Sequence, residues 1–136
     1  MSIKELKIGD LVSFTINYNT YGNIEGFENN NIANIKSISK DINDLYSVFI
    51  EDLYPVKLTT SILMHNGWKI VKHVVDEDNF EWITYEKESS SIQLEYYPET
   101  NQFSSFTYGT ELIEIKYVHE LQHLLWSMKE DDNLKL

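Results

Sequence analysis

Two histidines near the end of the chain have the spacing of a metal site. Residues 119–123 read His-Glu-Leu-Gln-His, which is the HExxH signature of zinc metallopeptidases. On a helix, His119 and His123 project from one side and can share a metal ion, while Glu120 can act as general base towards a metal-bound water. The motif therefore raises the hypothesis of a small zinc enzyme.

A catalytic zinc ion also needs a third protein ligand, and the sequence does not supply an obvious one. The carboxylates that follow His123 belong to a short charged tail, and the extended metzincin pattern is absent. His65 and His73 could contribute from upstream, but nothing in the sequence requires it. The sequence therefore favours a protein without a cofactor and leaves enzymatic activity open, with a non-enzyme preferred; zinc bound by His119 and His123 is kept as the alternative.

The segment that carries the motif is predicted to be an amphipathic helix over residues 117–128. Its apolar side chains recur at helical spacing and cover an arc of about 120°. His119, His123 and Trp126 fall within about 60° of one another on the opposite side. We expect the apolar side to pack on a sheet and the His-Trp side to face solvent or a partner. The apolar side is formed by Val118, Leu121, Leu124, Leu125 and Met128.

The first part of the chain has the pattern of short strands. In residues 11–18, Val12, Phe14, Ile16 and Tyr18 alternate with other residues and would share one face. Residues 32–38 and 45–50 predict two more strands, joined by a turn over 39–44. Residues 19–31 are rich in Gly and Asn and predict a binding loop, with Tyr21 and Phe27 as contact residues. We expect residues 1–54 to form a small SH3-like barrel or sheet.

The second part, residues 55–136, is predicted to hold a short helix over 59–67, an antiparallel meander and the closing helix. The meander strands are expected at 68–75, 80–87, 92–97, 103–108 and 112–115. Tyr85, Glu95 and Tyr97, with Glu81, could form an acidic and aromatic patch on its outer side, although such residues are also ordinary strand formers. The predicted fold class is α+β and mainly β, in two subdomains or one compact domain.

The composition excludes several functions. The chain of 136 residues has no cysteine, so disulfides and thiolate sites are impossible. A formal net charge of −11 without a visible Lys cluster disfavours duplex DNA as a ligand and is compatible with a basic partner surface. No apolar run has membrane-spanning length and the first residues do not resemble a secretory signal. We expect a cytoplasmic protein.

Three segments in this order resemble short proteins of phages and mobile elements of Bacteroidetes-type bacteria. The segments are 6–10 (LKIGD), 55–68 (PVKLTTSILMHNGW) and 117–126 (YVHELQHLLW). In that group an Asn usually stands where this chain has His123, which counts against a metal site. The resemblance implies no known activity, and it implies an accessory protein that acts in a host cell.

These observations together predict a non-enzymatic binding protein, an inhibitor or anti-defence factor that acts on a host protein or a small signalling molecule. A zinc metalloenzyme and a structural protein that forms a homodimer are the alternatives. The contact residues expected are His119, His123, Trp126, Tyr21, Phe27, Tyr85, Glu95 and Tyr97.

Overall fold

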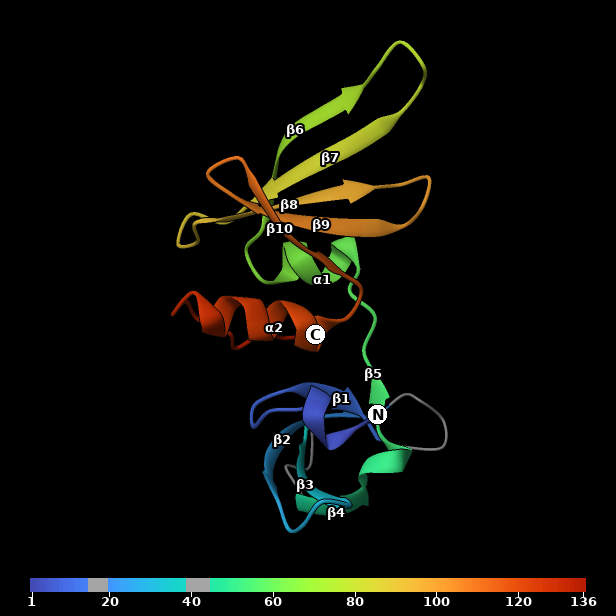
Figure 1. The fold of residues 1–136 in the computed structure, drawn as a ribbon, viewed down its shortest axis with the longest axis vertical. Coiled ribbons are helices and arrows are strands. Elements are labelled where there is room, and N and C mark those ends of the chain that lie inside the picture. Colours follow the sequence, from blue (N-terminus) through green and yellow to red (C-terminus); the bar gives the residue numbers. More distant parts are fainter. Residues whose placement is uncertain (15–19, 39–44) are drawn as a thin grey trace. The chain divides into compact units, whose positions relative to one another are not determined.

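The computed structural model describes residues 1–14, 20–38 and 45–136 of the chain. It is mainly β, with two antiparallel sheets and a helix near the C-terminus, so the predicted fold class is confirmed (Figure 1). The chain divides into two compact units. The first comprises residues 1–57 and 117–133, and the second comprises 58–116 and 134–136.

The sheet of the first unit contains five strands in the order β4-β3-β2-β1-β5, and each neighbouring pair is antiparallel. A 3-10 turn at Ile50–Asp52 precedes the short last strand, which returns to pair with β1. The SH3-like architecture itself stays a prediction. The strands are β1 (Leu11–Ser13), β2 (Tyr21–Phe27), β3 (Ile32–Ser37), β4 (Leu45–Phe49) and β5 (Tyr54–Pro55).

The predicted loop over residues 19–31 is wrong for most of its length, because Tyr21–Phe27 form strand β2. Gly22, one of the glycines that suggested a loop, allows two strands to pack closely. A Cβ atom at Gly22 would lie 2.5 Å from Cγ2 of Ile35 and 2.7 Å from the carbonyl oxygen of Lys36. Gly22 therefore allows β2 to approach β3, where a larger residue would clash.

A compact apolar core lies within the first unit. Val12, Ile24, Ala33 and Ile35 from three strands are fully buried, and Leu53 joins them from the segment before β5. Phe14 is packed against this core, whereas Ile16, Tyr18 and the turn at 39–44 lie outside the described residues. The burial of alternate positions on β2 and β3 follows the period of two that a half-buried strand requires.

Helix α2 (Val118–Ser127) belongs to the first unit, whereas the sequence had grouped it with the second half. The start of the helix is hydrogen-bonded to the segment that follows β5. The Val118 N–H donates to the carbonyl of Val56, and Tyr117 forms an isolated antiparallel β-bridge with Lys57. These are contacts between distant parts of the chain. The helix itself matches the prediction, with Tyr117 and Met128 as its caps.

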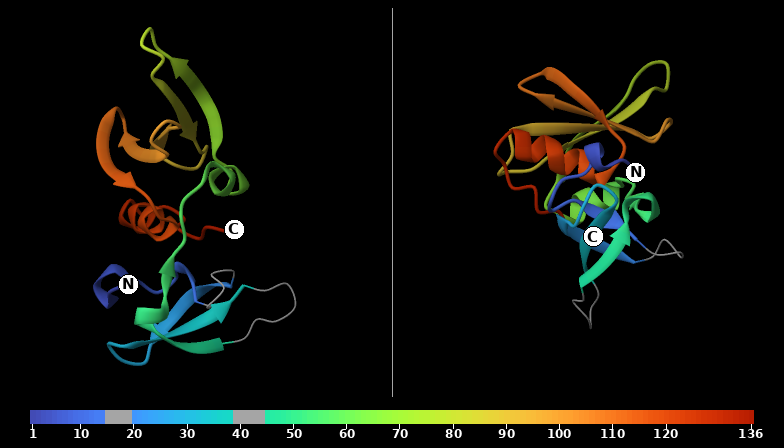
Figure 2. Two further views of the ribbon diagram at one scale, coloured as in Figure 1. Left: turned by 90° about the vertical axis from the view of Figure 1, so that its right-hand side faces the viewer. Right: turned by 60° about the horizontal axis from the view of Figure 1, so that its bottom comes forward.

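The second unit is a five-stranded meander in the order β10-β9-β8-β7-β6, with every strand antiparallel to the next. Figure 2 shows the ribbon from two further directions. The helix α1 (Thr60–His65) precedes it, and the side chain of Thr59 caps this helix by accepting from the Ile62 N–H at 3.2 Å. The predicted helix and meander are confirmed to within about two residues at each boundary. The strands are β6 (Lys69–Val75), β7 (Glu81–Glu86), β8 (Ile92–Tyr97), β9 (Gln102–Thr107) and β10 (Thr110–Ile115).

One side of the meander forms the core of the second unit. Tyr85 on β7 pairs with Leu94 on β8, and residues that face each other across strands share a side of the sheet. Both are buried, together with Phe103 and Ile115. The hydroxyl of Tyr85 is hydrogen-bonded to Thr60, so α1 lies on this inner side. Among the described residues, no helix has the length and apolarity needed to cross a membrane.

Candidate functional site

The HExxH residues lie in helix α2, and most of them contact other parts of the first unit. The backbone N–H of Tyr117 donates to Oε1 of Glu120 at 2.9 Å, so the carboxylate of Glu120 caps the first turn of the helix. Leu121 is fully buried. The structure therefore gives Glu120 a role in holding the helix, which is independent of any metal.

The side chain of Gln122, which was not among the predicted site residues, hydrogen-bonds the helix to strand β1. Its Oε1 accepts from the Leu11 N–H at 2.8 Å, and its Nε2 donates to the carbonyls of Gly9 at 3.0 Å and Asp132 at 3.2 Å. The side chain is 3% exposed. A glutamine in the helix interior among hydrophobic residues was the available signal, because a buried amide needs several polar partners.

His123 pairs with Asp10, which is not among the predicted contact residues. Nε2 of His123 lies 2.8 Å from both carboxylate oxygens of Asp10. The Asp10 side chain is 3% exposed and also accepts from the Lys7 N–H at 2.8 Å. Burial raises the pKa of Asp10, while the Lys7 N–H and His123 act in the opposite direction.

The expectation that His119 faces solvent or a partner is wrong. Its side chain is 6% exposed, stacks on Tyr117 with ring centroids 5.8 Å apart, and meets the edge of His123 at 5.5 Å. Nδ1 of His119 is buried without a hydrogen-bond partner. Burial lowers the pKa of His119 and favours its neutral form, with smaller opposing effects from Asp10.

Trp126 is 60% exposed, as expected for the outer side of the helix. The ammonium group of Lys7 lies 4.0 Å from the centre of its ring, a cation–π contact. The predicted His-Trp side is therefore divided, since Trp126 faces solvent while His119 is buried and His123 is half-buried. The helix has a second covered side besides its apolar one, because β1 and the segment before it pack there and bond to Gln122.

Within the part of the chain that the structure describes, no group of three or more His, Cys, Asp or Glu residues is arranged to hold a metal ion. In the first unit, His119, His123 and Asp10 lie near one another, but a single nitrogen of His123 contacts the carboxylate directly. Zinc binding at the HExxH motif stays an untested alternative, and so does a homodimer through this helix.

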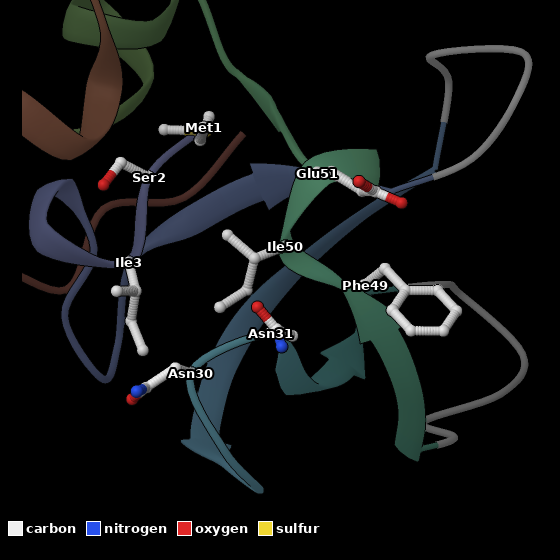
Figure 3. Close-up of a pocket in the computed structure, with 8 residues that line it drawn as sticks. All are labelled: Met1, Ser2, Ile3, Asn30, Asn31, Phe49, Ile50 and Glu51. Atoms are coloured by element: carbon white, nitrogen blue, oxygen red, sulfur yellow. The ribbon is translucent and has the colours of Figure 1, made fainter.

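The first unit also contains a hollow of about 580 Å³ between its N-terminal residues, the turn that joins β2 to β3, and the 3-10 turn that follows β4 (Figure 3). Met1, Ser2 and Ile3 lie along one side of it, and Phe49 and Glu51 along the other. Asn30 and Asn31, at the end of the predicted binding loop, line it as well.

The two aromatic residues predicted as contacts in that loop lie in strand β2 instead. Tyr21 and Phe27 are both half-buried, and Phe27 packs against the core.

The side of the meander opposite α1, which we call the outer face, carries an aromatic cluster. The ring of Phe80 lies 5.8 Å from that of Trp82 and 5.8 Å from that of Tyr97, with tilted planes. Phe80 is 40% exposed, while Trp82 and Tyr97 are partly exposed. Of these three residues, the sequence had singled out only Tyr97.

Carboxylates also occupy strand positions on the outer face. The strand register places Glu95 opposite Thr84 and Ser104, and Ser104 opposite Glu114. In the next row, Glu86 pairs with Gln93 across β7 and β8. Phe106 pairs with both Gln93 and Glu111, which brings the edge strand β10 into the row. Two basic residues also stand in these rows: Lys72 is opposite Thr84 and Lys69 is opposite Glu86.

The predicted acidic and aromatic patch is therefore correct for Glu95 and Tyr97 and wrong for Tyr85. Tyr85 is 2% exposed and lies on the inner side, because it occupies an odd-numbered position of a strand whose even-numbered residues face outward. Glu81 also lies apart from the outer face, since its carboxylate is 3.1 Å from His73.

The side chains of Tyr97 and Glu95 are hydrogen-bonded to each other on the outer face. The hydroxyl of Tyr97 donates to Oε2 of Glu95 at 2.7 Å. Burial, together with the hydrogen bond and the charge of Glu95, raises the pKa of Tyr97 to about 12. The phenol therefore stays protonated and holds one oxygen of the Glu95 carboxylate, so that the orientation of this carboxylate next to the ring is restrained.

Comparison of the chain with protein-family models, with curated proteins and with solved structures finds no significant match.

Proposed function

We propose that this protein is a non-enzymatic binding module and that it recognises a protein partner with the outer face of its second sheet. The observation that carries the proposal is the cluster of Phe80, Trp82 and Tyr97 on a side of the sheet that neither α1 nor the inner core uses. Aromatic side chains with exposed area are frequent anchors of protein interfaces, because they bury a large surface at a small cost in conformational entropy.

The shape of the surface supports a protein partner over a small signalling molecule. Ligand sites for small molecules are concave and enclose most of the ligand. The outer face is built from adjacent strand positions of an open meander, and its rings pack on each other instead of surrounding a cavity. The resemblance of the sequence to short phage and mobile-element proteins would make the partner a host protein and the protein an inhibitor or anti-defence factor.

The residues of the HExxH motif support the same proposal indirectly. Glu120 caps the helix, Gln122 bonds to β1, and His123 is paired with Asp10. Each therefore has a role in stabilising the first unit. The motif does not need a catalytic function to account for its residues.

The proposal is tested by affinity capture from a lysate of a bacterium of the expected host group, with quantitative mass spectrometry. The full chain is compared with Trp82→Ala, Phe80→Ala and the control Tyr108→Ala, which removes an aromatic ring that is 92% exposed elsewhere in the same unit. We expect the first two variants to recover a specific partner about tenfold less than the wild type. The control should recover it unchanged.

The opposite pattern would contradict the proposal. If Trp82→Ala and Phe80→Ala are folded by circular dichroism and recover the same proteins as the wild type, the outer face is not the contact surface. Loss of the partner in Tyr108→Ala alone would place the contact at the β9–β10 turn.

A further inference from the structure

The outer face combines rings and negative charge in a way that restricts the chemistry of its partner. Glu86, Glu95, Glu111 and Glu114 stand in two strand rows of this face. Lys69, opposite Glu86, and Lys72, opposite Thr84, are the basic residues of these rows, so the carboxylates are in excess. One of these carboxylates, that of Glu86, accepts a hydrogen bond from the amide of Gln93. A partner that buries this surface must compensate the charge of the remaining carboxylates, because an unpaired buried carboxylate is strongly unfavourable.

The chain cannot supply an arginine to such a surface. All 11 of its basic residues are lysines, against 22 acidic residues. A second copy of the chain would add further negative charge to the interface, with a net charge of −11 on each molecule. The charge distribution therefore favours a different and basic partner over self-association.

The arrangement of Tyr97 and Glu95 fits one cationic group in particular. The hydroxyl of Tyr97 engages Oε2 of Glu95, while the ring of Tyr97 belongs to the aromatic cluster. A guanidinium group is planar, so it can stack on a ring and donate to an adjacent carboxylate with the same atoms. A lysine ammonium group is a compact point charge and gains less from the ring and from paired acceptors.

We infer that the outer face binds an arginine side chain on a basic segment of the partner protein, stacked on the aromatic cluster and paired with Glu95. This inference rests on the proposed function and adds the chemical class of the partner. It explains why aromatic rings and carboxylates occupy adjacent positions on one side of the sheet, whereas the inner side carries apolar residues.

Fluorescence anisotropy with a labelled peptide of repeated Gly-Ser-Arg units tests the inference on the full chain at low ionic strength. Matched peptides replace Arg by Lys or by citrulline, which has the shape of arginine and no charge. We expect the Arg peptide to bind at least about tenfold more tightly than the citrulline peptide, and more tightly than the Lys peptide.

Two double variants separate the outer face from net charge. Glu95→Gln with Glu114→Gln removes two carboxylates from the outer face with little change in shape. Glu25→Gln with Glu51→Gln removes the same charge from exposed positions of the first unit. We expect the first double variant to weaken binding of the Arg peptide about tenfold and the second by less than about twofold.

Three results would overturn the inference. They are equal binding of the Arg and citrulline peptides, equal binding of the Arg and Lys peptides, and equal weakening by the two double variants. If one of these occurs while Trp82→Ala still abolishes capture of a cellular partner, the proposed function stands and only its arginine chemistry fails. If Trp82→Ala leaves that capture intact, the proposed function fails as well.

Discussion

At the scale of single residues, the chemistry that the sequence suggested for His119 differs from what the structure gives it. The residue was expected at an exposed metal or contact site, and it is buried between Tyr117 and His123 with an unpaired Nδ1. A buried neutral histidine makes folding sensitive to pH, because the unfolded chain accepts a proton that the folded chain excludes.

The pH dependence of stability tests this environment. The pKa of His119 is lowered from its usual 6.5 in the folded state. As pH falls below 6.5, the unfolded state binds a proton that the folded state does not, so this residue lowers the free energy of unfolding by at most about 1.4 kcal/mol per pH unit. In His119→Phe, which keeps a ring beside Tyr117, we expect a smaller loss of stability between pH 7.5 and about 5.5, measured by urea unfolding.

Asp10 acts in the opposite direction. Its pKa is raised above 3.8, so protonation of Asp10 favours the folded state at pH values below its folded pKa. The comparison of His119→Phe with the wild type isolates the histidine, because both proteins retain Asp10. His65→Gln, which changes an exposed histidine, serves as the matched control. An unchanged pH dependence in His119→Phe would contradict a buried neutral His119.

At the scale of elements, strand β2 shows how packing overrides local propensity. Gly22, Asn23 and Gly26 are typical of loops, and they lie in a strand that pairs with both β1 and β3. Two glycines of the same strand differ in their surroundings. A Cβ atom at Gly22 would clash with Ile35 and Lys36, whereas one at Gly26 would meet nothing within 4 Å.

Two alanine substitutions on β2 provide a matched pair. We expect Gly22→Ala to lower the free energy of unfolding by about 1–3 kcal/mol, because the neighbouring strand must shift to admit the methyl group. Gly26→Ala should change stability by less than about 1 kcal/mol. Urea unfolding of both variants measures the difference, and equal effects at the two positions would contradict the close contact of β2 with β3.

At the scale of the whole molecule, the excess of acidic residues is the dominant property. With 22 acidic and 11 basic residues, repulsion between like charges opposes folding at neutral pH. In two ion pairs of the described residues, His73 with Glu81 and His123 with Asp10, the basic group is a histidine.

Salt should therefore stabilise the protein. We expect the midpoint of thermal unfolding at pH 7.5 to rise by a few degrees between about 0.01 and 0.15 M NaCl, because the Debye length falls from about 30 to 8 Å and screens the repulsion. Differential scanning calorimetry measures the shift, with an equal osmolarity of glucose as the control. A midpoint that falls with NaCl would show that attractive pairs dominate.

Much of the fold could be predicted from the sequence, because its signals are local. The apolar residues of α2 recur at 3.6-residue spacing, Thr59 is a good helix cap, and strands β8 and β9 of the second sheet alternate between buried and more exposed residues over much of their length. Part of the outer face followed in the same way, since Glu95 and Tyr97 lie two residues apart on one strand.

Only the tertiary structure decided which residues that are distant in the chain contact each other. Neither the pairing of His123 with Asp10 nor the bonds from Gln122 to Leu11 and Gly9 has a local signal, because these residues lie more than a hundred positions apart. The same holds for the burial of Tyr85 under α1 and for the close approach of β3 to Gly22. Periodicity shows that a helix has two sides, but only the packing of other elements against it shows that His119 is buried and Trp126 is exposed.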